Sequence, residues 1–300
     1  MANDPHNLAF QTKKMLQELL TDRGLKPRHR YGQHFLIDRN LAEKLVAAAD
    51  LRPSDCVLEV GAGTGSLTAL LARSAGAVVA VEIDEHLADI AAERLATAAN
   101  VTLVRGDALD SKSVLSGRVV AGVRQASAAT AGALKLVANL PYDIATPLLM
   151  DILLSGLGFG CLCFTVQTEV ADRILAEAGT ADYGPVSIIT RLLCTGRRIC
   201  KVPPQAFWPM PKVFSTMVRL QARPAADIPV SHPSSFAAFV RRFFMHRRKT
   251  LAHLVKNMDD PGCLLHAIQH VGLDPTARPE TLTVEQWVNF YQTALPESRR

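Results

Sequence analysis

Five short apolar runs, rich in β-branched residues, alternate with helical stretches in the first part of this 300-residue chain. Such runs are typical of parallel strands that are buried on both faces, because the connecting helices cover the sheet. The expected fold class is therefore α/β, with a Rossmann-like sheet and helices on both faces. The expected strands are residues 56–60, 77–82, 101–107, 134–140 and 161–167, and the expected helices between them are 66–74, 85–97 and 144–155.

Both flanks of this pattern contain further predicted elements. Helices are expected before it and two strands after it, whereas the intervening stretch 108–133 is either a helix or an insertion. The expected flanking helices are residues 6–24 and 39–50, and the expected late strands are 199–203 and 213–220.

The end of the chain has a different character. A Pro-rich linker at 221–235 precedes residues 236–295, which have helical spacing and no strand pattern. We therefore expect a small all-α C-terminal domain. The expected domains are an N-terminal helical extension (1–30), an α/β domain (31–222) and the small helical domain (223–300).

Composition excludes several classes of protein. Charged residues make up 20% and hydrophobic residues 48%, which is normal for a folded domain and excludes global disorder. No apolar run approaches the ~18–20 residues that span a bilayer, and the N-terminus lacks the pattern of a secretory signal. The six cysteines form no CxxC pair. We expect reduced core thiols, no metal site, no membrane contact and a cytoplasmic location.

Charge is concentrated in one segment. The whole chain has 33 Lys and Arg against 28 Asp and Glu, but residues 183–258 hold 13 basic residues and a single acid, Asp227. That segment carries +12 and the remainder −7. A polyanion such as nucleic acid would bind such a surface, and a solvated basic face is the alternative.

A glycine-rich turn follows the first strand of the alternating pattern. The sequence Gly61-Ala62-Gly63-Thr64-Gly65 has the spacing GxGxG, which differs from the dinucleotide pattern GxGxxG. The second strand ends in Glu82 and the third in Asp107. These acids are placed to accept hydrogen bonds from ribose hydroxyls and from an adenine amine. The alternative is a tight turn with two surface acids. Together the three features resemble the S-adenosylmethionine (SAM) methyltransferase pattern.

The fourth strand ends in Asn139-Leu140-Pro141-Tyr142. An aromatic exocyclic amine is a poor nucleophile, so acceptors aimed at its N–H groups would favour a reactive pyramidal nitrogen. The Asn139 side chain and the Leu140 carbonyl are suitable acceptors, and Pro141 stiffens the turn. Tyr142 offers a ring on which an extruded base stacks. The alternative is a strand-ending turn with a buried Tyr.

With these motifs the chain resembles the KsgA-type rRNA adenine N6-dimethyltransferase family, from about residue 31 to residue 256. Many methyltransferases share the glycine turn, whereas NLPY followed by VPPxxFxPxPKVxS is a much narrower signature. The matching segments are GQHFLID (32–38), LEVGAGTGSLT (58–68), VEIDE (81–85), GDAL (106–109), NLPY (139–142), FTVQTEVADRI (164–174), YGPVSI (183–188), VPPQAFWPMPKVFSTMVRL (202–220) and RRKTL (247–251).

This resemblance implies a SAM site and a base site. Position 34 is usually Asn in the family, and the His34 found here is expected to stay neutral beside the sulfonium. Its alternative role is to cap the helix near Asp38. Phe207 matches the family Phe that covers the second face of the base, with a core role as the alternative. The implied SAM-binding residues are Gln33, His34, Leu36, Gly61, Gly63, Gly65, Glu82, Asp107 and Asn139.

The resemblance also implies an RNA substrate. It is small-subunit (16S) rRNA, with dimethylation of two adjacent adenines in the 3′-terminal hairpin loop and a role in subunit biogenesis. We expect a monomer that binds the small ribosomal subunit. Phe243 and Phe244 are expected to anchor their helix. The expected RNA-binding residues are Arg197, Arg198, Lys212, Arg241, Arg247, Arg248 and Lys249.

Three other functions stay open at this stage. An Erm-like enzyme of the same fold would dimethylate one adenine in large-subunit rRNA. An assembly factor would bind the small subunit without needing catalysis. A nicotinamide oxidoreductase is the generic alternative for such a sheet, but it explains neither NLPY nor the basic segment.

Overall fold

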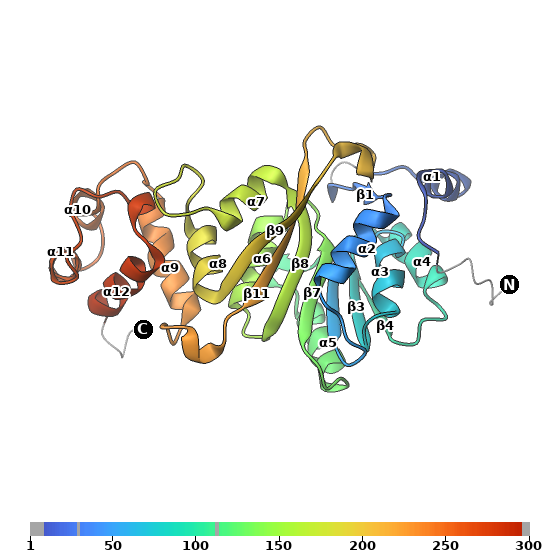
Figure 1. Ribbon diagram of the computed structural model, residues 1–300, viewed down its shortest axis with the longest axis horizontal. Helices are drawn as coiled ribbons and strands as arrows, with labels where there is room; N and C mark the ends of the chain where they lie inside the picture. The colour runs from blue at the N-terminus through green and yellow to red at the C-terminus, as the bar shows by residue number, and fades with distance from the viewer. Residues whose placement is uncertain (1–8, 29–30, 112–113, 296–300) are drawn as a thin grey trace. The chain divides into compact units, whose positions relative to one another are not determined.

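The computed structural model describes residues 9–28, 31–111 and 114–295. A seven-stranded sheet with the order β4-β3-β2-β7-β8-β11-β9 forms its centre (Figure 1). The first five of these strands run parallel, and β11 pairs antiparallel with β8. The strands are β2 (Cys56–Val60), β3 (Ala77–Glu82), β4 (Val101–Arg105), β7 (Leu134–Asn139), β8 (Phe159–Gln167), β9 (Cys194–Val202) and β11 (Ser215–Ala222).

Helices cover both faces of this sheet, as the sequence predicts. Val78 of β3 packs in a core cluster with α2 and α3, whereas a Cβ on Gly122 of α5 would lie 3.5 Å from Val79. Successive strand residues point to opposite faces, so α3 and α5 lie on opposite sides. The helices are α2 (Arg39–Ala48), α3 (Ser66–Ala72), α4 (Glu85–Arg94), α5 (Gly117–Ala128) and α6 (Ala145–Leu154).

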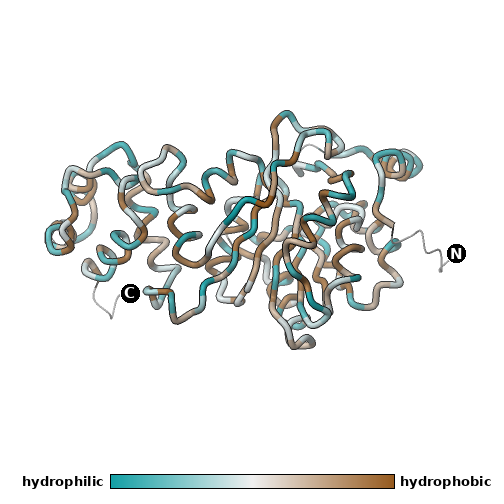
Figure 2. The backbone as a smooth tube through the Cα atoms, viewed as in Figure 1, coloured by the Kyte–Doolittle hydropathy of each residue, from teal (hydrophilic) through white to brown (hydrophobic). Residues whose placement is uncertain are grey.

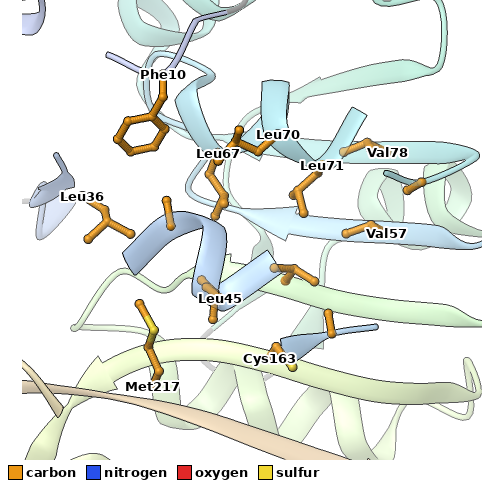
Figure 3. Packing of buried hydrophobic residues seen from close by; sticks show 14 of the residues in the cluster. Phe10, Leu36, Leu45, Val57, Leu67, Leu70, Leu71, Val78, Cys163 and Met217 are labelled. Atoms are coloured by element: carbon orange, nitrogen blue, oxygen red, sulfur yellow. The ribbon is translucent and has the colours of Figure 1, made fainter. Parts of the chain in front are cut away.

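The core cluster on the α2 side is continuous across the sheet. Leu45 of α2 and Leu71 of α3 are fully buried against Val57, Cys163 and other strand residues (Figure 3). Burying an aliphatic side chain of this size contributes about 1.5–3 kcal/mol. Figure 2 shows the corresponding pattern along the chain, with hydrophobic residues on the central strands and hydrophilic ones on exposed helices such as α1 (Lys13–Asp22).

The boundaries of the predicted elements are confirmed in most places. The strands at 56–60 and 77–82 agree with the structure residue by residue. The helix expected at 6–24 begins only at Lys13, where the Thr12 side chain caps it, and residues 6–8 lie outside the described part of the chain. The uncertain stretch 108–133 contains a short hairpin, β5 (Leu109–Ser111) and β6 (Val114–Leu115), and then α5.

Two helices were not predicted, α7 (Thr168–Leu175) and α8 (Pro185–Leu193). Two two-residue strands, β1 (Phe35–Leu36) and β10 (Phe207–Trp208), pair with each other apart from the main sheet. In the part of the chain that the model describes, no helix has the length and apolar character needed to cross a membrane.

The chain divides into two compact units. The first contains the described residues up to Ala171 together with Arg197–Gln221, and the second contains Asp172–Gly196 together with the described residues from Ala222 onward. The domain boundaries expected at residues 30 and 222 stay predictions. The second unit has its own aromatic core, in which Phe239, Phe243 and Trp287 pack against one another. Its C-terminal helices are α9 (Pro233–Phe244), α10 (Leu251–Val255), α11 (Pro261–His270) and α12 (Val284–Ala294).

Candidate active site

A cavity of about 310 Å³ opens at the carboxyl ends of β2, β3, β4 and β7. Parallel strands of an α/β sheet place their following turns together at this edge, where ligands bind. Of the residues predicted to form the SAM and base sites, the cavity wall includes Gln33, His34, Leu36, Gly61, Gly63, Glu82, Asp107, Asn139, Leu140, Pro141 and Tyr142.

The glycine turn forms one wall of the cavity. Gly61 and Gly63 have φ angles of 83° and 57°, in the left-handed region that side chains disfavour. A Cβ on Gly61 would lie 3.2 Å from Cγ of Pro141. The turn therefore packs directly against the NLPY segment, and a side chain at position 61 would separate them. Gly65 does not line the cavity but caps α3 in the left-handed conformation.

Glu82 is buried beside this turn. Its two carboxylate oxygens accept the N–H groups of Gly63 at 2.7 Å and Asp84 at 2.9 Å. Burial raises the pKa of Glu82 above its usual range, although these two bonds oppose the shift. Each carboxylate oxygen has a further lone pair, so the group is still able to accept hydrogen bonds from a ligand. Asp107 is exposed, and one of its oxygens accepts the N–H of Leu109 at 3.0 Å.

Asn139 lines the cavity and has an unused hydrogen-bond acceptor. Its Nδ2 donates to the His34 carbonyl at 2.9 Å, which fixes the orientation of the amide. Its Oδ1 is buried and has no hydrogen-bond partner among the described residues. An unsatisfied buried acceptor costs about 1–3 kcal/mol, so its retention needs a reason. A ligand that donates an N–H would satisfy it.

Tyr142 is held on two sides. Its hydroxyl is hydrogen-bonded to Oγ of Ser215 at 2.7 Å, and burial raises its pKa. The His34 ring stacks on the Tyr142 ring with centroids 5.3 Å apart. Because these contacts fix the ring, it is pre-positioned for an incoming aromatic ligand.

His34 also binds residues 203–211, which contain four prolines and are called the Pro-rich loop below. Its Nδ1 lies 2.7 Å from the carbonyl oxygen of Pro209 and donates to it, because a carbonyl only accepts. The alternative role considered for His34, capping the next helix, is wrong. Asp38 caps α2 with its own carboxylate, which accepts the N–H of Leu41 at 3.1 Å.

Gln33 links the segment before β1 to the start of α4. Its side chain accepts from the Arg28 N–H at 2.7 Å and donates to the Asp84 carboxylate at 3.1 Å. Arg28 pairs with the same carboxylate at 3.3 Å. The side chain of Gln33 therefore holds the backbone together beside the cavity. Leu36 contributes an apolar, mostly buried side chain to the cavity wall.

Several cavity residues were missed by the sequence reasoning. Gln11 lines the cavity, and its Oε1 accepts hydrogen bonds from Thr64, Ser66 and Arg94. Arg94 is buried, and burial lowers its pKa to about 10. Its Nη2 donates to the Ala9 carbonyl at 2.9 Å. This network fastens residues 9–11 over the glycine turn. It joins positions about 80 residues apart, so no local spacing predicts it.

Glu59 is a second missed residue. It lines the cavity, is 1% exposed, and its Oε2 has no partner within the described residues. Burial raises the pKa of Glu59 to about 8, although the nearby Thr68 hydroxyl opposes the shift; the charge of Glu82 adds to it. The side chain is therefore largely protonated at neutral pH. The signal in the sequence was a charged residue inside an otherwise apolar strand.

Phe207 is not brought to the cavity. Its side chain is 2% exposed and packs in the α2-side core, and its backbone pairs with Leu36. The interpretation of Phe207 as a ring that covers the target base is therefore not supported by its position, because the core already surrounds it. The alternative, a core Phe that anchors the Pro-rich loop, agrees with the structure.

The predicted RNA-binding residues fall in both units. Arg197, Arg198 and Lys212 belong to the first unit, and the other predicted residues, from Arg241 to Lys249, belong to the second. All are exposed except Arg247, which is half-buried and donates to the Ala181 carbonyl at 2.9 Å. Their role in binding RNA stays a prediction. Phe243 is fully buried in the aromatic core, as expected for an anchor of α9.

Comparison with known proteins connects this site to a family. The model of the family described as ribosomal RNA adenine dimethylase matches residues 24–294. Ribosomal RNA small subunit methyltransferase A of Pelotomaculum thermopropionicum is 40% identical over 286 residues, which cover 94% of this chain and 96% of that protein. The protein of the same name from Moorella thermoacetica is 38% identical, with 92% and 95% of the two chains covered.

Solved structures agree with this assignment. A dimethyladenosine transferase from Plasmodium falciparum superposes with a TM-score of 0.69 at 25% identity, covering 86% of this chain and 96% of that one. The 23S rRNA methyltransferase ErmE superposes with a TM-score of 0.61 at 25% identity, covering 87% and 99%. The fold, the cavity at the strand ends and the matched length lead to one conclusion: this chain belongs to the ribosomal RNA adenine dimethylase family.

Proposed function

We propose that this protein transfers methyl groups from SAM to the N6-amino groups of two adjacent adenines in the 3′-terminal hairpin loop of small-subunit (16S) rRNA. The observation that carries the proposal is the buried, unpartnered Oδ1 of Asn139 beside the fixed ring of Tyr142. An adenine offers both an N–H donor and a flat face to these groups. The names of the relatives support the small subunit as the substrate.

The cavity fits SAM in size and in chemistry. Its volume of about 310 Å³ is within the usual range for small-molecule sites, roughly 300–1,000 Å³. The turn at Gly61 and Gly63 leaves the backbone open to close approach, and Glu82 would accept ribose hydroxyls. Bound SAM supplies an electrophilic methyl group on a sulfonium. His34, Leu36 and Asp107 would complete its binding site.

Catalysis rests on positioning the adenine amine. Asn139 Oδ1 accepts one N–H of the amine, and the Leu140 carbonyl accepts the other, which directs the nitrogen lone pair at the methyl carbon. The N–C bond forms as the C–S bond breaks, and the proton then leaves the nitrogen to water. Such placement of reactants supplies most of the rate acceleration in reactions of this kind.

Tyr142 holds the base during transfer. One face of its ring is covered by His34, so the adenine stacks on the other face. Stacking of one base on an aromatic ring contributes about 1–3 kcal/mol, which offsets part of the cost of extruding it. An unpaired loop keeps that cost low. With Phe207 in the core, the second face of the base needs a different cover.

The rest of the chain binds the ribosomal particle. The acid-poor segment 183–258 supplies positive charge for phosphates, with Arg241, Arg248 and Lys249 exposed in the second unit. We assign catalysis to residues 31–222 and RNA binding to residues 223–300, with residues 1–30 as an extension. The protein acts as a monomer in the cytoplasm, where it takes part in small-subunit biogenesis.

The similarity to ErmE favours one second candidate, dimethylation of an adenine in large-subunit rRNA. A binding factor without catalysis is the third. Labelled methyl transfer from SAM to purified small subunits that lack the modification, with large subunits in parallel and nucleoside analysis, separates them. We expect N6,N6-dimethyladenosine in small-subunit RNA alone. Label in the large subunit would favour the second candidate, and no label with SAM still bound would favour the third.

A further inference from the structure

The loop between β10 and β11 exposes a cluster of apolar side chains. Met210, Val213 and Phe214 are 62%, 45% and 46% exposed, and they lie within five consecutive residues. Four other large apolar side chains in the described ranges are exposed, and they are scattered along the chain. A cluster of this kind marks a contact surface more often than a single exposed side chain does.

The backbone of this loop is fixed at both ends. The Phe214 carbonyl accepts the N–H of Thr168 at 3.0 Å and its hydroxyl at 3.1 Å. At the other end, the Pro209 carbonyl accepts from His34 at 2.7 Å. The exposure of Phe214 is therefore not the result of a loose chain end, and the ring is presented to solvent by an anchored backbone.

A cation accompanies the exposed ring. Nζ of Lys201 lies 4.0 Å from the centroid of the Phe214 ring, within the range of a cation–π contact. The strand and loop from Cys194 to Phe214 contain four basic residues and no Asp or Glu. An apolar ring inside an acid-free basic segment is complementary to a base next to its phosphate, and a neutral apolar partner would not need the charge.

Phe214 is also next in the chain to a residue that contacts the candidate base site. Ser215, which follows Phe214, is hydrogen-bonded to the Tyr142 hydroxyl at 2.7 Å. Consecutive Cα atoms are about 3.8 Å apart. Successive side chains of an extended strand point to opposite faces, so the Phe214 ring points away from Ser215, and a base on it would belong to a neighbouring nucleotide and not to the adenine on Tyr142.

We propose that Phe214, together with Lys201, binds an unpaired nucleotide adjacent to the target adenine, with its base on the Phe214 ring and its phosphate beside the Lys201 ammonium. Phe214 is thus a substrate-binding residue that neither the motifs nor the family comparison assigns. The proposal rests on the proposed function, since it names a contact of the same substrate. Exposed aromatic side chains of this kind bind single-stranded RNA by stacking on its bases.

The test compares Phe214→Trp, Phe214→Leu and Phe214→Ala with the wild type, using unmodified small subunits. Phe214→Ala should raise KM for subunits about tenfold and leave kcat and SAM affinity within about twofold. Trp should restore binding because it keeps an aromatic face, whereas Leu should not, although it is apolar. Val114→Ala, at a residue 54% exposed in the β5–β6 hairpin, is the matched control and should behave as wild type.

Two results would overturn the proposal. An unchanged KM for Phe214→Ala would remove Phe214 from the substrate site. Full rescue by Leu would show an apolar contact, as with a ribosomal protein, rather than stacking. A second measurement covers Lys201, because Lys201→Ala should lower the slope of log KM against log salt by about one.

Failure of the proposed function would be visible separately, because the wild type would then transfer no methyl group to small subunits. In that event, fluorescence anisotropy with a labelled single-stranded oligoadenylate decides the matter. Affinity that falls in the order Trp and Phe, then Leu and Ala, supports stacking at position 214. Equal affinities, or no binding by the wild type, would overturn it.

Discussion

At the amino ends of the central strands, a buried ion pair is fully satisfied by its surroundings. Nζ of Lys135 lies 2.8 Å from the Asp55 carboxylate and also donates to the carbonyls of Ala49 and Asp50. Asp55 accepts two backbone N–H groups as well. Burial alone would raise the pKa of Asp55, but these bonds hold it below the usual range.

At the carboxyl ends of the same strands, buried polar groups are left incomplete. Glu59 Oε2 and Asn139 Oδ1 have no partner among the residues the model describes. Both edges belong to one sheet and bury similar groups. Buried polar groups alone therefore do not mark a binding site, whereas an unpaired acceptor on a residue that lines a cavity does. Substitutions at the two edges should therefore have different readouts.

The largest expected effect is on stability, at the amino edge. Lys135→Met leaves the Asp55 carboxylate buried without its cation, and we expect a loss of about 3–5 kcal/mol in the free energy of unfolding. Urea denaturation measures it. The kcat of the folded fraction should stay within about twofold. Lys14→Met, which removes an exposed pair with Glu18, is the control and should cost less than about 0.5 kcal/mol. An equal loss in both variants would contradict the comparison.

Asn139→Ala should have the opposite effects, with a large loss in kcat and little loss in stability. Removing the acceptor that positions the amine should lower kcat at least about 100-fold, as seen when one preorganised polar group is deleted from an active site. Methyl transfer under saturating substrate measures it, with thermal unfolding to show that the fold persists. Methyl transfer at the wild-type rate would show that the proposed mechanism at NLPY is wrong.

Gly61→Ala should weaken SAM binding about tenfold or more. The φ of 83° disfavours a side chain, and the new Cβ would press on Pro141. Isothermal titration with SAM measures the change. Gly122→Ala is the matched control, since that helical glycine has ordinary space around it. Its helix should gain about 0.5–1 kcal/mol with unchanged SAM affinity. Equal SAM affinity in both variants would show that the glycine turn at Gly61 does not contact SAM.

At the carboxyl edge, Glu59 should also make the free energy of unfolding depend on pH. The folded protein keeps this proton up to a pKa of about 8, while the unfolded chain loses it near the ordinary value of 4.5. The folded state therefore binds more protons between these values, and stability falls as pH rises through that window. Glu59→Gln should remove most of this fall, which amounts to about 3–4 kcal/mol between pH 5 and pH 8 for these two pKa values.

Unfolding at several pH values measures this slope. Glu93→Gln is the control, because the hydrogen bond from Arg23 lowers the pKa of Glu93 and moves its contribution below this window. A slope that does not differ between wild type and Glu59→Gln would show that Glu59 is ionised in the folded state.

The sequence predicted the parts of this fold that local patterns encode. β2 and β3 are continuous apolar runs between polar turns, so both ends are visible in the residues themselves. The glycine turn and the acids that follow the strands depend on the same short-range order. For this reason eleven predicted residues meet in one cavity.

The remainder depends on contacts that no local pattern contains. Gln11 contacts Arg94, which is 83 residues away in the sequence. Phe207 enters the core because its strand β10 pairs with Leu36 of β1. An aromatic residue in a motif looks the same in sequence whether it lines a cavity or fills a core. The antiparallel pairing of β11 with β8 likewise follows from the tertiary fold, since its run of apolar residues would suit either direction.

The pairing of β1 with β10 has a consequence for biosynthesis. His34 and the Pro209 carbonyl that it binds are 175 residues apart along the chain. At a ribosomal rate of about 5–20 residues per second, the partner of the GQHF segment emerges roughly 10–35 s after that segment. A nascent chain that ends before β10 already contains the glycine turn, but it lacks the strand that pairs with β1 and holds the GQHF segment in place. The chain should therefore bind SAM only late in synthesis, so SAM binding would indicate that the catalytic unit is complete.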